Sequence, residues 1–98
     1  MTFGFHPAAL REYDEAANWY EEQRHLLGEE FTAAVEKAVA AVLAGPERYP
    51  PAPDGTRAIR LKRFPFHLFY LFDEASAHVR VMAVYHEKRR PGLWRGRA

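Results

Sequence analysis

The stretch FPFHLFYLFDEASAHVRVMAVYH, residues 64–86, decides the fold. It contains two apolar runs rich in aromatic and β-branched residues, and the short polar segment DEASA separates them. This composition predicts two β-strands, at residues 66–72 and 79–85, that are joined as a hairpin. The first run is apolar on nearly both faces, which is typical of a central strand. The sequence therefore predicts a sheet built around this hairpin.

Two further strands are expected upstream. Residues 57–61 alternate, with Ile59 and Leu61 on one face, and residues 2–5 form a short run with Phe3 and Phe5 on one face. The intervening segment PERYPPAPDGT, residues 46–56, is rich in proline and turn formers, which indicates a connector. It is too short to separate two domains.

Residues 7–45 carry the periodicity of two helices. The first is expected from Pro7 to about Leu27, where Gly28 breaks it, and the second ends at Gly45 and Pro46. The apolar face of the first contains Leu10, Tyr13, Ala17, Tyr20 and Leu27, with Trp19 expected beside Tyr20 at the helix interface, and that of the second contains Phe31, Val35, Ala38 and Val42. A tight junction between helices of similar length predicts an antiparallel hairpin.

The order of elements is therefore β-αα-βββ. It predicts an α+β fold, with a small antiparallel or mixed sheet and the helical hairpin packed on one face. With 98 residues, of which 48% are hydrophobic and 14% aromatic, the chain can form one hydrophobic core, so residues 1–98 are expected to be a single domain.

Several classes of protein are excluded by what the sequence lacks. There is no cysteine, no phosphate-binding glycine loop and no thiol nucleophile. Glu21 and His25 lie one helical turn apart, but two ligands without a third do not make a metal site. We therefore expect no metal and no other cofactor. The absence of a signal peptide and of any apolar run of about 18 residues predicts a cytoplasmic protein with no membrane partner.

Positive charge is concentrated in the second half of the chain. Residues 1–50 carry four basic and nine acidic side chains, a net charge of −5, whereas residues 51–98 carry ten basic and four acidic ones, a net charge of +6. On or beside the expected strands lie Arg57, Arg60, Lys62, Arg63, Arg80, Lys88, Arg89 and Arg90. Gathered on one face of the sheet, they would bind phosphate or another negatively charged target. The alternative is a rim of cations that keeps edge strands from self-association.

Residues at the end of the last strand are further candidates. His86 lies where side chains emerge into solvent, so it can act as an acid or base near neutral pH, or simply hydrogen-bond a loop. Tyr85 and Trp94 are aromatic side chains close to the cations. Trp94 can stack a nucleobase, but we expect it to anchor the C-terminal segment against the sheet.

These segments resemble the RelE/ParE family, the toxins of bacterial type II toxin–antitoxin systems. The resemblance rests on a strand with the pattern Phe-Pro-aromatic-x-aliphatic-x-Tyr and a later strand that ends in His-x-x-Arg with Pro and Trp behind it. Here these positions are Phe64, Pro65, Phe66, Leu68, Tyr70, His86, Arg89, Pro91 and Trp94. The segments at residues 15–23, 28–36 and 46–50 also match in order, so the resemblance covers nearly the whole chain.

The resemblance implies the fold described above and a cognate antitoxin that covers the toxin. It leaves the target open, because RelE-like toxins cut mRNA in the ribosomal A site, whereas ParE-like toxins inhibit DNA gyrase and cut nothing. As a metal-independent nuclease, the chain would use His86 as the acid and cations to hold the phosphate: Arg89, Arg60, Lys62 and Arg80. Where many family members carry Arg, this chain has His67, which is either the missing base or a strand histidine with satisfied hydrogen bonds.

We expect a toxin that inhibits growth when free and is neutralised by its antitoxin. ParE-like inhibition of gyrase is slightly favoured, because the helical hairpin and the FPF strand resemble ParE-type members and the nuclease set lacks a base and one cation. The alternative is a ribosome-dependent mRNA endonuclease that uses His86 and the Arg/Lys surface. A third class is a domain that only binds RNA or a partner and leaves growth unaffected.

Overall fold

The computed structural model describes residues 1–90 and 92–97, and Pro91, which carries part of the family resemblance, lies outside the described residues. The elements are β1 (Thr2–Phe5), α1 (Pro7–Gln23), α2 (Leu27–Ala44), β2 (Arg57–Arg60), β3 (Phe66–Asp73) and β4 (His78–His86). The expected order β-αα-βββ is therefore confirmed. The strand bounds differ from the expected ones by one residue at several ends, and β2 stops before Leu61.

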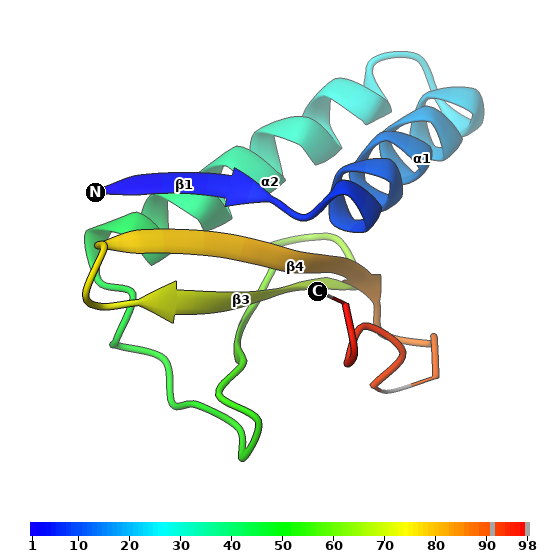
Figure 1. Cartoon of the computed structure of the whole chain (residues 1–98). Coiled ribbons are helices and arrows are strands. Elements are labelled where there is room, and N and C mark those ends of the chain that lie inside the picture. The colour runs from blue at the N-terminus through cyan, green and yellow to red at the C-terminus, as the bar shows by residue number, and fades with distance from the viewer. Residues whose placement is uncertain (91, 98) are drawn as a thin grey trace.

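The four strands form one mixed sheet in the order β1-β4-β3-β2. Figure 1 shows β1, β4 and β3 side by side. β1 runs parallel to β4, whereas β3 is antiparallel to both β4 and β2. β3 and β4 are thus the central strands, and β1 and β2 are the edges, so the central position expected for β3 is confirmed. Each central strand is paired on both sides, so its backbone N–H and C=O groups are satisfied within the sheet.

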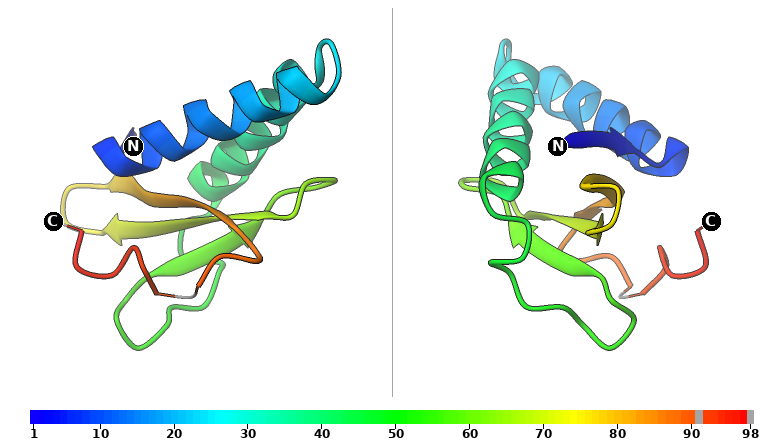
Figure 2. Two further views of the ribbon diagram at one scale, coloured as in Figure 1. Left: turned by 90° about the vertical axis from the view of Figure 1, so that its right-hand side faces the viewer. Right: turned by 60° about the vertical axis from the view of Figure 1, so that its left-hand side comes forward.

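The helices and the C-terminal segment lie on opposite faces of the sheet (Figure 2). α1 and α2 cover one face, and the main core between them and the sheet includes Phe31, Val35, Phe64, Phe66, Leu68 and Val84. A smaller cluster lies on the other face, where Trp94 of the C-terminal segment packs with Phe69, Ala83 and Tyr85. The expected layer of helices on one face of the sheet is confirmed. The C-terminal segment covers part of the other face.

The junction between the helices comes earlier than expected. α1 ends at Gln23, and Leu27 and Gly28 belong to α2, so the expectation that α1 continues to Leu27 is wrong. The Glu21 carboxylate accepts hydrogen bonds from the backbone N–H groups of Leu26 and Gly28, which satisfies amides at the start of α2. Periodicity alone did not reveal this reversal, because Leu27 lies in phase with the α1 pattern.

Gly28 has a packing role rather than the role of a helix breaker. A Cβ at this position would lie 2.6 Å from the carbonyl oxygen of Ala17 on α1. The glycine therefore lets the two helices approach closely at the start of α2.

Two apolar side chains of α1 were assigned to the core and are exposed instead. Leu10 is 46% exposed and Trp19 is 56% exposed, whereas Ala9 is fully buried. Successive residues of a helix are turned by about 100°, so Tyr20 faces the core while Trp19 points to solvent and meets the Tyr20 ring at an edge, 5.1 Å between centroids. The expectation that Trp19 is a core residue is wrong.

An irregularity in the β3–β4 pairing shapes the neighbourhood of the site. Phe69 pairs with Ala83 but Tyr70 pairs with Val81, so β4 carries one extra residue, Met82, at a β-bulge. Next to the bulge, the Val84 N–H donates to Glu12 of α1 and the Met82 carbonyl accepts from Arg97. At the bulge, backbone N–H and C=O groups of β4 therefore form hydrogen bonds with charged side chains instead of with a neighbouring strand.

Candidate functional site

A hollow of about 200 Å³ lies at the end of β4, on the face away from the helices. The residues that line it are His67, Phe69, Tyr85, His86, Glu87, Arg89 and Trp94. We call this hollow the terminal pocket. It brings together the residues that the sequence places near His86, because the antiparallel register sets His67 of β3 opposite Tyr85 of β4.

His86 lies between two hollows. Its Nδ1 accepts a hydrogen bond from the backbone N–H of Lys88 at 3.0 Å, and its ring meets Phe66 at an edge, 5.1 Å between centroids. A neutral ring with Nδ1 as acceptor carries its proton on Nε2. On its other side His86 lines an aromatic hollow together with Trp19, Tyr20 and Phe66. The imidazole is therefore held in place but remains partly accessible.

Glu87 belongs to the terminal pocket and was missed by the sequence reasoning. Its Oε1 accepts from Nε of Arg60 at 2.5 Å and lies 4.0 Å from Nδ1 of His67. The hydrogen bond from Arg60 lowers the pKa of the Glu87 carboxyl below its ordinary value, although desolvation opposes the shift. A carboxylate directly after His86 was visible in the sequence, but its pairing with Arg60 depends on the position of β2.

Arg89 lies across the face of the Tyr85 ring, with the guanidinium carbon 4.4 Å from the centroid. Its Nη1 also donates to Oε2 of Glu12 at 2.8 Å. Arg97 donates two hydrogen bonds to the same carboxylate, at 2.9 and 2.7 Å. Burial opposes ionisation of Glu12, but the hydrogen bonds from Arg97, the Val84 N–H and Arg89 together hold its pKa below the ordinary value. Through these contacts Glu12 connects α1 to Arg89 and Arg97 at the two ends of the C-terminal segment.

Trp94 forms one wall of the terminal pocket and is 5% exposed. Its ring stacks on Phe69, with centroids 3.9 Å apart and an interplanar angle of 17°, and meets Tyr85 at an edge. The Tyr85 hydroxyl donates to the carbonyl of Arg90 at 2.7 Å. The expected anchoring of the C-terminal segment by Trp94 is confirmed.

The cations expected to share one face are divided among several places. Arg89 lines the terminal pocket, Arg60 pairs with Glu87 of its lining, and Lys88 and Arg90 are exposed after the end of β4. Arg57 donates to the backbone carbonyls of Glu47 and Tyr49. Arg63 pairs with Glu30 of α2, and Lys62 lines a cleft beside the same helix. Arg80 lies next to β1. A single convergent cationic face is therefore not formed.

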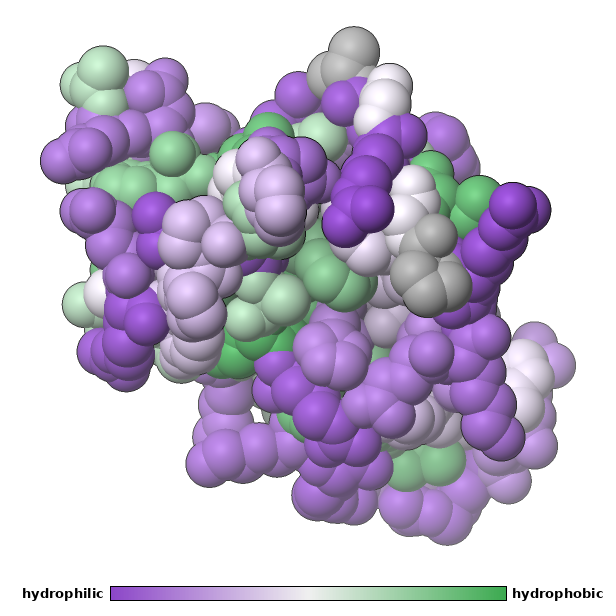
Figure 3. Space-filling model, turned by 90° about the horizontal axis from the view of Figure 1, so that it is seen from below, coloured by the Kyte–Doolittle hydropathy of each residue, from purple (hydrophilic) through white to green (hydrophobic). Residues whose placement is uncertain are grey.

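Strand geometry explains this distribution. Residues three apart on a strand point to opposite faces, which separates Arg57 from Arg60. Lys62 and Arg63 follow the end of β2 and turn towards α2, with Arg63 in a left-handed conformation at φ 72°. Arg80 is six residues before His86 on β4, a separation of about 20 Å along an extended strand. Seen from below, the face under the sheet is largely hydrophilic, with apolar areas between the polar side chains (Figure 3).

The described residues hold no group of three or more His, Cys, Asp or Glu side chains that could bind a metal ion. The pair singled out in the sequence has another role, since Glu21 accepts from backbone amides and lies 3.3 Å from Nδ1 of His25. Within residues 1–90 and 92–97, neither helix has the length and apolar character of a membrane span.

Comparison with known proteins gives a family and a fold. A search of curated proteins finds no match. Among solved structures, the chain is similar to one described as the chromosomal ParDE TA system from P. aeruginosa, with a TM-score of 0.61 and 17% sequence identity, over 88% of this chain and 95% of that one. At this identity the likeness shows a shared fold. The family model described as the ParE toxin of the type II toxin–antitoxin system parDE matches residues 4–91, and the chain therefore belongs to the ParE toxin family.

Proposed function

We propose that this toxin, when free of its antitoxin, arrests growth by binding and inhibiting DNA gyrase, and that it does not cleave RNA. The observation that carries the proposal is the charge balance around the terminal pocket. Arg89, which lines the pocket, is paired with Glu12, and Arg60 is paired with Glu87 of the pocket lining, so both guanidinium groups already have a carboxylate partner. Membership of the ParE toxin family supports the same target.

Cleavage of RNA without a metal places different demands on a site. The attacking 2′-hydroxyl needs a general base, the leaving oxygen needs an acid, and unpaired cations must stabilise the charge that develops on the phosphate. At the terminal pocket the Arg60 and Arg89 charges are offset by Glu87 and Glu12, so a phosphate would first have to displace a carboxylate. Binding of a protein surface needs no general acid, no general base and no unpaired cation for charge that develops on a phosphate, so the charge balance at the pocket is compatible with it.

A second function has one observation in its favour. His86 and Glu87 lie in the same pocket, with Nδ1 of His86 fixed as an acceptor, so an acid and a base are both present. A ribosome-dependent endonuclease would use Nε2 of His86 as the proton donor and the Glu87 carboxylate as the base. This alternative assigns both residues roles that the gyrase proposal does not need.

The two functions are separated by measuring both activities with the same protein. The purified chain is added to a DNA supercoiling assay with gyrase and to a translation extract in which mRNA cleavage is read by primer extension. We expect loss of supercoiling, intact mRNA, and unchanged toxicity of His86→Ala. Ribosome-dependent cleavage that His86→Ala abolishes, with normal supercoiling, would overturn the gyrase proposal.

A cognate antitoxin is the partner that a toxin of this family implies. We propose that it is encoded beside this chain and that both proteins act in the cytoplasm, where gyrase and ribosomes are found. Expression of the chain alone should stop growth, and co-expression of the adjacent short reading frame should restore it. Normal growth during expression of a folded chain would contradict the proposed toxicity.

A further inference from the structure

The strand β1 lies at one edge of the sheet, and in Figure 1 it is the outermost of the three labelled strands. The N–H group of His6, directly after β1, donates to the carbonyl of Val81 on β4 at 2.8 Å. By the two-residue period of a strand, the N–H and C=O groups of Phe3 and Phe5 therefore point away from β4. Among the described residues, no other segment pairs with these groups.

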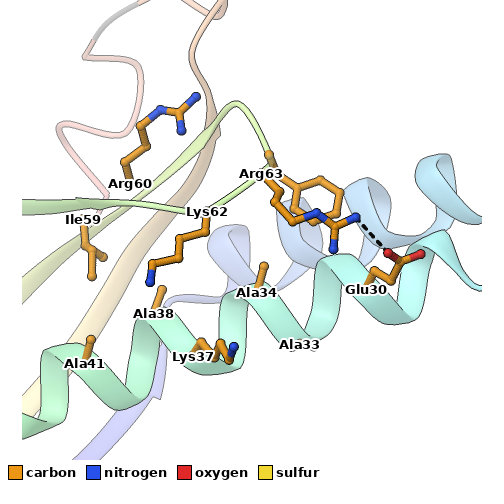
Figure 4. A pocket seen from close by; sticks show the side chains of 11 residues that line it. Glu30, Ala33, Ala34, Lys37, Ala38, Ala41, Ile59, Arg60, Lys62 and Arg63 are labelled. Atoms are coloured by element: carbon orange, nitrogen blue, oxygen red, sulfur yellow. Dashed lines mark hydrogen bonds and ion pairs between the residues drawn. The ribbon is translucent and has the colours of Figure 1, made fainter.

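The two edges of the sheet differ in charge. β2 carries Arg57 and Arg60, and two further cations, Lys62 and Arg63, follow it directly. Figure 4 shows the last two beside α2, where Arg63 pairs with Glu30. β1, in contrast, has the sequence TFGF and no charged side chain. Cations on an edge strand oppose its pairing with a like strand, so β1 is the edge without this protection.

An apolar hollow of about 300 Å³ adjoins β1 on the side of the helices. Its lining includes Phe3 and Phe5 of β1, Tyr13 of α1, and Val39, Leu43 and Glu36 of α2. The Phe3 ring is 47% exposed and meets the Phe5 ring at an edge, 6.2 Å between centroids. An exposed aromatic ring that continues into an apolar hollow is typical of a surface that binds another protein. We call the open edge of β1 together with this hollow the β1 surface.

We propose that the β1 surface is a dimer interface, at which β1 pairs antiparallel with β1 of a second copy of this chain. A two-fold axis perpendicular to the sheet relates the copies, and the two four-stranded sheets become one. With the axis at Gly4, Phe3 of each copy lies opposite Phe5 of the other. The N–H and C=O groups that point away from β4 then form the hydrogen bonds between the copies.

The residues of β1 fit this arrangement on both faces of the sheet. At the axis the two Gly4 residues form a non-hydrogen-bonded pair, with Cα atoms about 4.5 Å apart. They carry no side chain, so the backbones meet there without a clash. On the helix side, Phe3 of each copy lies beside Phe5 of the other, and such cross-strand aromatic pairs stabilise a sheet. The exposed Phe3 ring is thereby removed from water.

The observations favour a second copy over other occupants. β1 has no cation for the phosphates of a nucleic acid. The net charge of the chain is only +1, so two copies repel each other weakly. The strand that the β1 surface fits is short and uncharged with aromatic rings on one face, and β1 is itself such a strand. Because it has only four residues, we expect a dissociation constant on the order of 10 µM.

Sedimentation velocity of the purified whole chain tests the dimer. Between about 1 µM and about 1 mM, the mass should rise from that of one chain to that of two. High salt should not weaken the dimer, because no charged groups pair at the β1 edges. In NMR spectra, solvent exchange at the Phe3 and Phe5 amides should slow as the concentration rises, because these groups become hydrogen-bond donors.

A charge on the edge gives a sharper test. Phe3→Lys should raise the dissociation constant at least about tenfold, since each dimer loses two buried aromatic rings. Circular dichroism checks that the fold is kept, as expected for a half-exposed side chain. The matched control is Leu93→Lys in the C-terminal segment, because Leu93 is similarly exposed, at 50%, and lies outside the β1 surface. This control should dimerise like the wild type.

A cysteine at the axis tests the register. The chain has no cysteine, and a Cβ at Gly4 would have its nearest neighbour at 3.9 Å, so Gly4→Cys adds a single tolerated thiol. Cα atoms about 4.5 Å apart lie within the range of a disulfide. Mild oxidation should therefore cross-link Gly4→Cys into dimers. Asn18→Cys, exposed on α1 outside the β1 surface, is the control and should remain monomeric on a denaturing gel.

Several results would overturn the proposal. These are a monomer up to about 1 mM, a dimer that Phe3→Lys leaves intact, or equal weakening by Leu93→Lys. Equal cross-linking of the two cysteine variants would reject the pairing at Gly4. A dimer that dissociates in high salt would assign the association to charged groups elsewhere. Because the readouts are mass, amide exchange and cross-linking, they succeed or fail independently of gyrase inhibition.

Discussion

Glu12 is the residue whose replacement should disturb the structure most specifically. Its carboxylate accepts four hydrogen bonds, from the Val84 N–H, from Arg89 and twice from Arg97, and so ties α1 to β4 and to both ends of the C-terminal segment. Glu12→Gln keeps the size of the side chain but removes its charge. One carboxylate oxygen becomes an NH₂ group, which cannot accept and would face a guanidinium.

The expected loss of stability follows from the burial of these groups. The Glu12 and Arg97 side chains are 13% and 16% exposed, whereas Arg89 is 44% exposed and contributes less. Removing one partner of a fully buried ion pair costs about 3–5 kcal/mol, and this pair lies at the margin of the protein, so we expect about 2 kcal/mol. For a domain of this size that lowers the melting temperature by about 8–16 °C.

The effect should depend on pH in a defined direction. The pKa of Glu12 lies below its ordinary value of 4.5 in the folded chain, so the ionised carboxylate stabilises the fold at neutral pH. This contribution is complete above the pKa of the unfolded chain and is lost as the pH falls through the pKa of the folded state. The difference in unfolding free energy between the wild type and Glu12→Gln should therefore shrink below about pH 4.5.

Urea unfolding followed by far-ultraviolet circular dichroism measures the difference at neutral pH and at about pH 3.5. Glu15→Gln is the matched control, because Glu15 is an exposed carboxylate on the same helix and its replacement should change stability by less than about 0.5 kcal/mol. The reasoning is refuted if Glu12→Gln is as stable as this control at neutral pH, or if its deficit is undiminished in acid.

Substitutions at three further residues test packing and charge. Trp94→Phe should cost less than about 1 kcal/mol and Trp94→Ala about 3 kcal/mol in urea unfolding, because the ring stacks on β3 while its buried N–H has no hydrogen-bond partner among the described residues. Gly28→Ala should cost about 1–3 kcal/mol in thermal unfolding, because the added Cβ would lie 2.6 Å from the Ala17 carbonyl oxygen. Arg60→Gln should raise the pKa of Glu87 in an NMR titration, because the hydrogen bond from Arg60 lowers it.

The glycine and arginine substitutions each have a control elsewhere in the chain. Gly4→Ala places a Cβ 3.9 Å from the nearest atom of the His78 ring, so it should be tolerated where Gly28→Ala is not. Arg63→Gln removes a cation that pairs with Glu30 and should leave the Glu87 titration unchanged. Equal effects of the two glycine variants, or of the two arginine variants, would contradict the assigned contacts.

The elements of the fold were predictable because their signals are local. A strand such as FHLFYLF is recognised from its own residues, and Gly45-Pro46 ends a helix wherever the helix packs. The error in the position of the helix junction was also local in origin. Leu27 continues the α1 periodicity by coincidence, and only the Glu21 hydrogen bonds to Leu26 and Gly28 show where the chain reverses.

The candidate site was predictable in part. His86, Tyr85 and Trp94 are close in sequence, and they meet in the terminal pocket with His67, which the hairpin brings opposite Tyr85. Glu87 directly follows His86, but nothing in the sequence marks it as a residue of the site. Its pairing with Arg60 depends on β2 lying next to β3.

The sequence by itself determined the order of helices and strands, the central position of β3 and the excess of positive charge in the second half. These features follow from periodicity, turn residues and composition, and all three can be read from residues that are close together in the sequence. Only the tertiary structure decided which charges meet. Glu12 and Arg97 are 85 positions apart and Arg60 and Glu87 are 27 apart, and both contacts depend on the sheet order and on the register and bulge of β4. A hydrogen-bonded ion pair forms only between groups that lie a few ångströms apart in space, so the partner of a charge is fixed by the fold rather than by its place in the chain.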